Sequence, residues 1–440
     1  MINLRKKNIY FLPLKEFSRR KDVGLIYAPL AGVCTLATEA EACSLNEDLP
    51  HYPNCERRDI LSELLSGSTD IAKENAVATA DDFLQLYVLP SFKCNFACSY
   101  CFSANGRATE EISLEDLLAT IDFFVSRHRI DSDRLSISYL GGGEPTLSWD
   151  KVRQGIEYAD LLAARQGIKI YHTVVTNGSM IDCVMARFFK KHDVLVRVSF
   201  EILPEIQSLQ RGKYDDVERG IKVLALEGTR HMVRSMITPN NVSLMEKMIE
   251  ELNLRFPSVR NVLFDPITSS ATFCDGETTR KFYELYIEHF LSARNVGKQL
   301  GIDVANATLR NLDLIVDRYC AGEFCLTPDG AITICHQVSS PREKGYEDFI
   351  YGKVVNGHLT IDRKKFQLLK SRYTIYDNPR CNDCDVKWTC GGGCTQQRRQ
   401  YSDDILDIVC DAERRLTAAF LLERIADGGN ISEMIENYGR

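Results

Sequence analysis

The chain has 440 residues, of which 44% are hydrophobic and 26% are charged, with a formal net charge of −7. This length suits two or three domains. A nucleic-acid-binding chain should be basic overall or carry a long basic stripe, and no apolar run approaches the roughly 18 residues that a membrane-spanning helix needs. The N-terminus lacks the apolar core and cleavage site of a signal peptide. We therefore expect a cytoplasmic protein with no nucleic-acid or membrane partner.

Sixteen cysteines are present, and in a reducing compartment they favour metal or redox chemistry over disulfides. Their distribution is uneven. Eight lie between Cys320 and Cys410, and three lie close together between Cys94 and Cys101. The scattered ones follow no spacing that predicts a role: Cys34, Cys43, Cys55, Cys183 and Cys274.

Residues 1–80 are predicted to form a small N-terminal unit. Segments 9–14 and 24–33 have the composition of short strands, and 58–65 that of a short helix. The unit is too small and too polar to be the catalytic body. Two interpretations stay open: an extension packed on the following barrel, or a docking unit that offers a strand edge to an extended peptide.

From residue 81 to about 310 the chain alternates strand and helix. The periodicity predicts strands at 83–89, 135–140, 168–176, 194–200, 231–238 and 261–266, with helices between them and a closing helix at 278–300. Such alternation indicates an α/β fold with a parallel sheet and right-handed crossovers. Six repeats suit a partial (β/α)6 barrel of TIM type, whose chemistry gathers at the carboxyl ends of the strands.

Three cysteines follow the first of these strands: Cys94, Cys98 and Cys101, in a C-x3-C-x2-C spacing. Three thiolates on one tight loop can hold three irons of a cubane cluster and leave the fourth iron without a protein ligand. That iron can bind a small chelating molecule and pass it one electron. A zinc site, which usually takes four protein ligands or three plus water, stays open as an alternative, as do buried thiols.

This spacing, with Tyr100 directly before the third cysteine, resembles the signature of the radical S-adenosylmethionine (SAM) enzymes. After the second strand come Gly141, Gly142, Gly143 and Glu144, which resemble the motif that holds the SAM amine. Glycines admit a ligand close to the backbone, and Glu144 or the neighbouring carbonyls can receive an ammonium group.

The same resemblance implies further contacts to SAM at the ends of later strands. Thr176 and Asn177 follow the third strand. Ser199 and Glu201 stand where the family usually has Ser and Asp near the ribose, so Glu201 departs from the pattern. Arg234, on the fifth strand, is expected either to pair with the SAM carboxylate or to form a structural ion pair.

Residues 311–440 are predicted to form a third unit, which ends in a helix at 411–426. Its cysteines are Cys320, Cys325, Cys335, Cys381, Cys384, Cys390, Cys394 and Cys410. A turn at 327–330 between short strands predicts a hairpin. Eight cysteines can close two cubanes, and a zinc ribbon is the alternative for 381–394.

The C-x2-C-x5-C-x3-C array with a trailing cysteine resembles the SPASM extension of radical SAM enzymes, so the resemblance covers residues 81 to about 415. The family's interleaved pattern implies one auxiliary 4Fe–4S cluster on Cys320, Cys325, Cys335 and Cys394. It implies a second on Cys381, Cys384, Cys390 and Cys410. The interval from Cys320 to Cys335 is shorter than in many members.

The resemblance also implies a function. SAM and three 4Fe–4S clusters, reduced by a flavodoxin- or ferredoxin-type electron donor, would generate a 5′-deoxyadenosyl radical that removes a hydrogen atom from the substrate. Because SPASM enzymes act mostly on peptides and proteins, we predict a maturase that installs a thioether or cyclophane crosslink in a ribosomally made precursor peptide.

Two alternatives stay open. Sulfatase maturases, which form formylglycine, carry an Asp as a base directly after the third cysteine of the first auxiliary set. This chain has His336 there, and we expect His336 to be either the base or a buried, hydrogen-bonded histidine beside a cluster. The other alternative is a non-catalytic iron–sulfur scaffold or electron-transfer partner. The three-cysteine loop and the glycine turn argue against it, because electron transfer needs neither.

Overall fold

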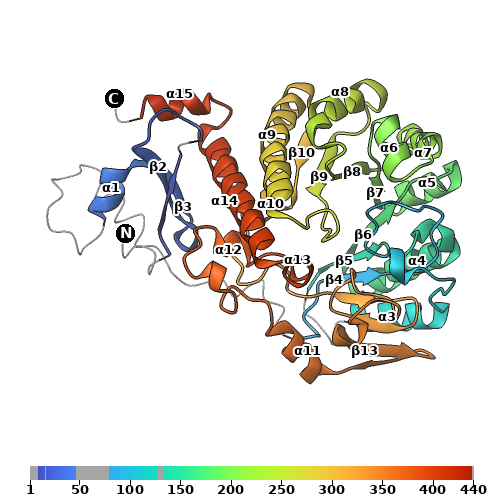
Figure 1. The fold of residues 1–440 in the computed structure, drawn as a ribbon. Helices are drawn as coiled ribbons and strands as arrows, with labels where there is room; N and C mark the ends of the chain where they lie inside the picture. The colour runs from blue at the N-terminus through green and yellow to red at the C-terminus, as the bar shows by residue number, and fades with distance from the viewer. Residues whose placement is uncertain (1–7, 15, 46–78, 127–131, 439–440) are drawn as a thin grey trace.

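The computed structural model describes residues 8–14, 16–45, 79–126 and 132–438. The helix predicted at 58–65 and Cys55 lie outside the described residues. A small three-stranded sheet and a large eleven-stranded sheet flanked by helices make up the fold (Figure 1). Within the described ranges, no helix combines the length and the apolarity needed to cross a membrane.

The barrel part of the large sheet is parallel throughout, and each strand pairs with the next along the chain. Its strands are β4 (Gln85–Val88), β5 (Arg134–Tyr139), β6 (Lys169–Thr176), β7 (Leu195–Ser199), β8 (His231–Ile237), β9 (Asn261–Pro266) and β10 (Asp303–Ala305). The predicted α/β partial barrel is confirmed, and β10 adds a strand that was not predicted.

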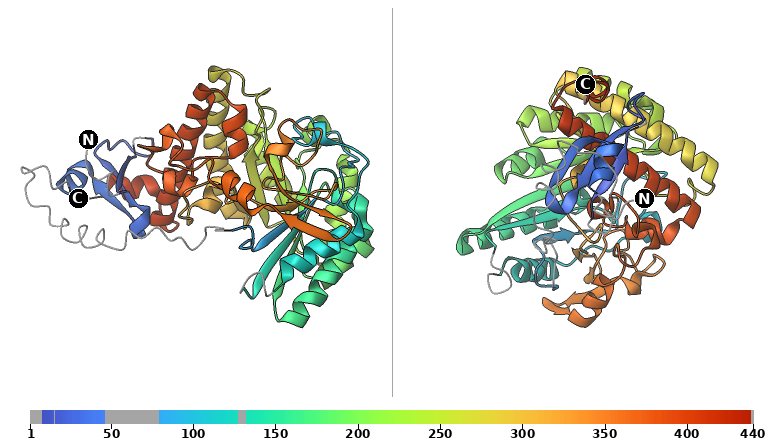
Figure 2. Two further views of the ribbon diagram at one scale, coloured as in Figure 1. Left: turned by 90° about the horizontal axis from the view of Figure 1, so that it is seen from below. Right: turned by 90° about the vertical axis from the view of Figure 1, so that its left-hand side faces the viewer.

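Helices cover the outer face of this sheet (Figure 2). They are α3 (Leu114–Val125), α4 (Trp149–Gln166), α5 (Cys183–Lys191), α6 (Pro204–Gln210), α7 (Tyr214–Glu227), α8 (Met245–Arg255) and α9 (Gly276–Leu300). Short α6 was not predicted. The side chain of Ser113 caps α3 by accepting the N–H of Asp116, as polar N-cap residues do.

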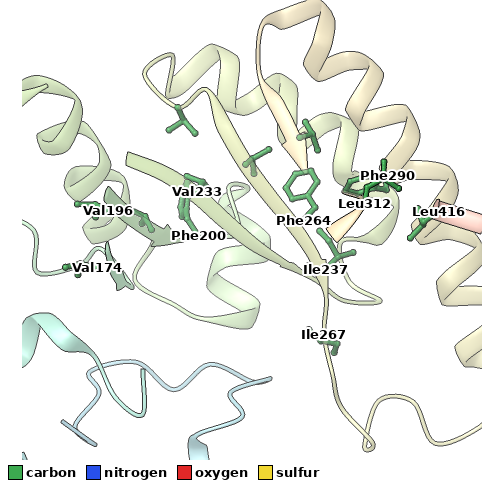
Figure 3. Close-up of a cluster of buried hydrophobic side chains, with 14 of the residues drawn as sticks. Val174, Val196, Phe200, Val233, Ile237, Phe264, Ile267, Phe290, Leu312 and Leu416 are labelled. Carbon is green, nitrogen blue, oxygen red and sulfur yellow. The ribbon is translucent and has the colours of Figure 1, made fainter. Parts of the chain in front are cut away.

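The core lies between the strands and these helices (Figure 3). Val196, Val233, Phe264 and Phe290 are fully buried in it, and each such side chain contributes about 1.5–3 kcal/mol by its burial. Successive side chains of a strand point to opposite faces. Strand residues next to these buried ones therefore face the concave side of the sheet.

The sheet continues beyond β4 into the C-terminal region. β11 (Phe324–Leu326) pairs with β4 in parallel, and β12 (Ala331–Thr333), β13 (Ile350–Val355) and β14 (His358–Ile361) follow in antiparallel order. β11 and β12 form the predicted hairpin. The region predicted as a third unit thus shares one sheet with the barrel.

Several helices complete the C-terminal region: α10 (Ala307–Asn311), α11 (Arg363–Lys370), α12 (Lys387–Cys390), α13 (Thr395–Gln400), α14 (Asp403–Ala426) and α15 (Ile431–Glu436). α14 begins before the predicted position 411, so Cys410 lies within the helix. α14 runs along α9 (Figure 1), and Arg294 of α9 pairs with Glu423 of α14 at 2.8 Å.

The N-terminal sheet comprises β1 (Tyr10–Pro13), β2 (Val23–Ala28) and β3 (Val33–Thr38), followed by α1 (Glu39–Ser44). The strand predicted at 24–33 is confirmed as far as Ala28, where β2 ends, because a 3-10 turn and Gly32 at φ 67° reverse the chain there. In its described residues, this sheet does not show the packing on the barrel that one of the two interpretations expected. The sheet packs beside α14 and α15 (Figure 1), where Ser18 donates to Glu436 at 2.7 Å.

Candidate active site

A cavity of about 1130 Å³ lies between the barrel strands and the C-terminal region. The loops after β4, β5 and β6 and the concave face of β7, β8 and β9 line one side. Predicted site residues in its lining are Cys94, Cys98, Cys101, Gly141, Gly142, Gly143, Glu144, Thr176, Asn177, Ser199, Arg234, Cys320, Cys335, His336, Cys390, Cys394 and Cys410. Parallel sheets gather their sites at this end.

Three predicted cluster ligands do not line the cavity: Cys325, Cys381 and Cys384. Cys325 lies on β11 and is fully buried in a small apolar cluster with Leu89 and Leu140. Cys381 is buried and Cys384 half-buried in the segment between α11 and α12.

Backbone contacts fix the three-cysteine loop against the glycine turn. Glu144 donates its N–H to the carbonyl oxygen of Lys93 at 2.7 Å. A Cβ on Gly143 would lie 1.9 Å from that same oxygen. Only glycine allows so close an approach, so the two motifs depend on each other for their positions.

Protein donors occupy the Glu144 carboxylate. Its Oε1 accepts from Thr146 N at 3.1 Å, Thr146 Oγ1 at 2.6 Å and Thr176 Oγ1 at 2.6 Å, and its Oε2 accepts from Asn177 N at 2.7 Å. Glu144 thus joins the ends of β5 and β6. Of the two predicted acceptors for an ammonium group, the carbonyls of the glycine turn fit better, because a carboxylate with four donors has little capacity left.

Asn177 connects the turn after β6 to the cysteine loop. Its Nδ2 donates to Asn95 Oδ1 at 2.8 Å, and Asn95 Nδ2 donates to Ser179 Oγ at 2.9 Å. Ser179 Oγ in turn donates to Asn177 Oδ1 at 2.7 Å. The predicted cofactor contacts Thr176 and Asn177 therefore also support the loop that carries the thiols.

Two arginines that the motifs did not predict lie beside these thiols. Burial raises the pKa of Cys94 and Cys98, whereas the charges of Arg107 and Arg211 oppose the rise. The Nε atoms of both arginines are buried and have no hydrogen-bond partner among the described residues. Orphaned cationic donors beside thiols suit an anionic group. These residues therefore fit an iron–sulfur cluster and the carboxylate of SAM.

No spacing rule would have found Arg107 or Arg211, because neither belongs to a motif. Arg211 also donates to the hydroxyl of Tyr100 at 2.8 Å, and Tyr100 donates to Glu201. Glu201 is fully buried and does not line the cavity, and burial raises its pKa. Of the two residues expected near the ribose, Ser199 lines the cavity and Glu201 does not.

Arg234 forms the ion pair with Asp265, at 3.1 Å, that one of the two predictions for it required. The pair does not use up the guanidinium, because 44% of the Arg234 side chain stays exposed. Both oxygens of Asp265 have partners, because the oxygen that does not bind Arg234 accepts the N–H of Ala307 at 2.9 Å.

His336 lies in the cavity wall, where Glu323 holds it. The backbone N–H of His336 donates to Glu323 Oε2 at 2.6 Å, and the ring Nδ1 contacts Glu323 Oε1 at 2.7 Å. The ring stacks on Tyr87 with centroids 5.9 Å apart. Nε2 is therefore the ring nitrogen that Glu323 does not bind. The sequence argument missed Glu323, which has no motif signal.

The C-terminal thiols separate into two groups. Burial raises the pKa of Cys335, and the neighbouring groups Glu323, Cys320 and Cys394 raise it further. Cys325 also lies near Cys335. This grouping places Cys394 with the earlier cysteines, as the interleaved family pattern implies.

The remaining thiols form the second group. Burial raises the pKa of Cys390, and so do Glu413 and the nearby thiols of Cys384, Cys410 and Cys381. Among the described residues, no three or more His, Cys, Asp or Glu side chains form a set that could hold a single metal ion. A cubane spreads its ligand sulfurs around a whole cluster, so its thiols need not converge as those of a zinc site must.

Comparison with known families agrees with this geometry. Residues 88–252 match the Radical SAM superfamily. The chain thus carries a radical SAM domain over these residues, and such a domain implies SAM and a 4Fe–4S cluster. The alternative of a non-catalytic scaffold is wrong.

The chain is similar to several enzymes that mature proteins or peptides. The chain is 25% identical over 343 residues to the cysteine-type anaerobic sulfatase-maturating enzyme of Clostridium novyi (strain NT), covering 72% of this chain and 88% of that one. Among solved structures, native anSMEcpe with bound AdoMet has a TM-score of 0.61 at 18% identity, covering 78% of this chain and 99% of that one. Streptococcus suis SuiB bound to precursor peptide SuiA has a TM-score of 0.52 at 15% identity, covering 90% and 97%. These structural likenesses show the fold.

Proposed function

We propose that this radical SAM enzyme matures a ribosomally made precursor peptide by installing a thioether or cyclophane crosslink. The observation that carries the proposal is the cavity that brings the three-cysteine loop, the glycine turn and the C-terminal cysteines to one space. Its volume of about 1130 Å³ slightly exceeds the range of about 300–1,000 Å³ of small-molecule pockets. The same cavity would hold SAM, the clusters at these thiols and the reacting part of the peptide.

The predicted site residues have separate roles in this reaction. Cys94, Cys98 and Cys101 would hold the cluster that binds SAM, which would supply the radical that removes one hydrogen atom, and the C-terminal cysteines would hold clusters able to accept one electron. In this proposal the carbonyls of the glycine turn orient the SAM amine, and Ser199 and Arg234 contact the rest of SAM. A flavodoxin- or ferredoxin-type protein supplies the first electron.

A crosslink removes two hydrogens from the peptide: one as an atom, the other as a proton and an electron. We assign the proton to His336, because Glu323 fixes its ring and leaves Nε2 for the substrate. The auxiliary clusters that take the electron are assigned to the two thiol groups, with Cys320, Cys325, Cys335 and Cys394 in the first and Cys381, Cys384, Cys390 and Cys410 in the second.

The N-terminal sheet is the proposed site for the rest of the precursor. An extended peptide adds to a sheet edge through main-chain hydrogen bonds. β1 has four residues, and Pro13 has no N–H to offer, so β3, with six residues, is the better edge. The similar fold of Streptococcus suis SuiB bound to precursor peptide SuiA supports a peptide as the substrate class.

A second candidate is formylglycine formation in a sulfatase. The curated relative from Clostridium novyi favours it, because the similarity extends over 72% of this chain. His336, in place of the Asp that the sulfatase-type pattern has after the third cysteine, counts against it. Both candidates share the same coarser activity, hydrogen abstraction from a peptide or protein.

Anaerobic reconstitution with iron and sulfide, followed by dithionite and SAM, tests the shared activity. Formation of 5′-deoxyadenosine is the expected result, and its absence would contradict the proposal. A short precursor encoded beside the gene then separates the candidates. Loss of two hydrogens from that peptide, seen by mass spectrometry, supports crosslinking. Conversion of Cys or Ser to an aldehyde in a sulfatase peptide supports the alternative.

A further inference from the structure

Two unpaired guanidiniums face the cavity. Arg197 belongs to β7 and Arg310 to α10, and both line the cavity. Within the described part of the chain, neither side chain has a hydrogen bond or ion pair, and the Nε of Arg197 is buried without a partner. A buried, unpaired guanidinium donor is costly. The buried Nε of Arg197 thus lacks a partner that an anion in the cavity would supply, whereas Arg310 is exposed.

The strand register explains why Arg197 points into the cavity. Its neighbours Val196 and Val198 are fully buried, and side chains along a strand alternate between faces. Arg197 and Ser199 therefore lie on the concave face. In the parallel register, Ser199 is opposite Arg234 of β8, which places Arg197 one pleat away from that arginine.

Asp265 holds α10, and with it Arg310, on the cavity wall that carries Arg197. One of its oxygens holds Arg234 at 3.1 Å, and the other accepts the N–H of Ala307, the first residue of α10, at 2.9 Å. α10 is thereby docked on β8 and β9. Arg310 follows within the next turn of this helix, on the side of the sheet that carries Arg197.

Among the described residues, no carboxylate forms an ion pair with Arg197 or Arg310, although Glu413 accepts from Thr308 of the same helix α10 at 2.8 Å. Burial lowers the pKa of Arg197, and the charges of Arg310 and Arg234 lower it further. Asp265 lies nearby but is already shared between Arg234 and the start of α10. The wall thus holds more positive than negative charge, and planar guanidiniums match a carboxylate in geometry as well as in sign.

We propose that Arg197 and Arg310 form a carboxylate-binding subsite for the substrate, so that the peptide presents an acidic side chain or its C-terminal carboxylate beside the reacting segment. This inference rests on the proposed peptide substrate. The SAM carboxylate is the other conceivable occupant. SAM, however, must lie at the three-cysteine loop, where Arg107 and Arg211 are the guanidiniums that act on the thiols.

A peptide-retention experiment tests this subsite. The cluster-loaded protein with SAM is incubated anaerobically with N-acetylated random hexapeptides, in one pool as C-terminal amides and in another as free acids, and the retained peptides are sequenced by mass spectrometry. The wild type should enrich Asp and Glu in the amide pool if a side chain binds. Enrichment confined to the free-acid pool identifies the C-terminal carboxylate.

Arg197→Gln and Arg310→Gln should each lower this enrichment by about tenfold or more, because each removes a charge-assisted hydrogen bond. Arg310 lies on the surface of a short helix, so its variant keeps the test decisive even where Arg197→Gln does not fold. The matched control is Arg153→Gln on α4, whose side chain pairs only with Glu157 one turn away.

Three results would overturn the proposal: no enrichment of acidic peptides by the wild type, equal enrichment by the variants, or a tenfold loss of SAM affinity in Arg197→Gln without a change in peptide selection. The last would assign the guanidinium to SAM. Formation of 5′-deoxyadenosine by the wild type is measured in parallel. Its absence refutes the proposed function itself, whereas its presence without acidic selection refutes only the subsite.

Discussion

The two cysteine regions of this protein are assembled in different ways. Cys94, Cys98 and Cys101 lie on one loop, and a glycine turn and two arginines support them from outside. The C-terminal thiols come from separate segments between Cys320 and Cys410 and depend on the tertiary fold to meet. A local motif can therefore be recognised as a unit, whereas the ligand pairing of a dispersed set becomes visible only in space.

The electrostatic surroundings of the two regions are alike in kind. Burial raises the pKa of Cys94 and Cys98 at the first loop, and nearby guanidiniums oppose the rise. In the C-terminal region burial also raises the pKa of Cys384 and Cys410, and the charge of Arg414 opposes the rise there. The two regions therefore differ in how the chain assembles them, not in the kind of charge around their thiols.

The strongest test of this contrast is the triple variant Cys94→Ala, Cys98→Ala, Cys101→Ala. If all three sites are cubanes, the wild type holds about twelve irons and the variant about eight. SAM cleavage should be abolished, because only the first site leaves an iron open. Iron analysis and a 5′-deoxyadenosine assay measure both effects. Persistent SAM cleavage would show that the radical site lies elsewhere.

The dispersed set can be tested by additivity. Cys320→Ala and Cys394→Ala are assigned to one cluster, so each should lower the iron content by up to about four, and the double variant should lose no more. Cys320→Ala combined with Cys410→Ala should lose about eight, because two clusters are affected. Additive losses for Cys320 and Cys394 would contradict the interleaved assignment.

The support of the first loop is tested by Gly143→Ala. Its Cβ would lie 1.9 Å from the Lys93 carbonyl oxygen, so the turn must move and about 1–3 kcal/mol of stability is expected to be lost. SAM affinity should fall with it. Gly276→Ala is the matched control, because its Cβ meets nothing closer than 3.6 Å. Thermal unfolding and SAM titration compare the two; equal behaviour would refute the docking argument.

The smallest effect on stability is expected from a substitution outside both cysteine regions, at Asp160. Asp160 on α4 accepts from His172 at 2.9 Å and contacts His192 Nδ1 at 2.6 Å. Burial alone would raise the pKa of Asp160, but the two histidine hydrogen bonds lower it below its usual value. A lowered pKa stabilises the fold above the unfolded pKa of about 3.9, and this stabilisation is lost as the pH falls through the folded value.

Asp160→Asn should therefore cost about 1 kcal/mol at pH 7, a modest figure because the carboxylate is partly screened by solvent. The deficit relative to wild type should shrink below pH 4. Urea unfolding at a series of pH values measures it, and SAM cleavage at pH 7 should be retained. A deficit that grows on acidification would show that the sign of the pKa shift is wrong.

Local patterns in the chain were enough to predict much of this molecule. Each parallel strand is a short apolar run followed by a helix with apolar spacing, so the α/β barrel follows from periodicity. The three cysteines, the glycine turn and the turn at 327–330 are contiguous motifs, and each forms the loop or turn that its sequence predicts. Short β10 and α6 were missed because three to seven residues carry too little periodicity to be recognised.

What only the tertiary structure decided are the contacts between distant segments. β11 joins β4 in parallel, which fuses the C-terminal region to the barrel, and the N-terminal sheet rests on α14 and α15. Glu144 is saturated by donors from β6, Glu201 is buried away from the cavity, and Arg197, Arg211 and Glu323 enter the site without any motif. Side-chain partners across a fold depend on packing between segments far apart in the chain, and that information is not local.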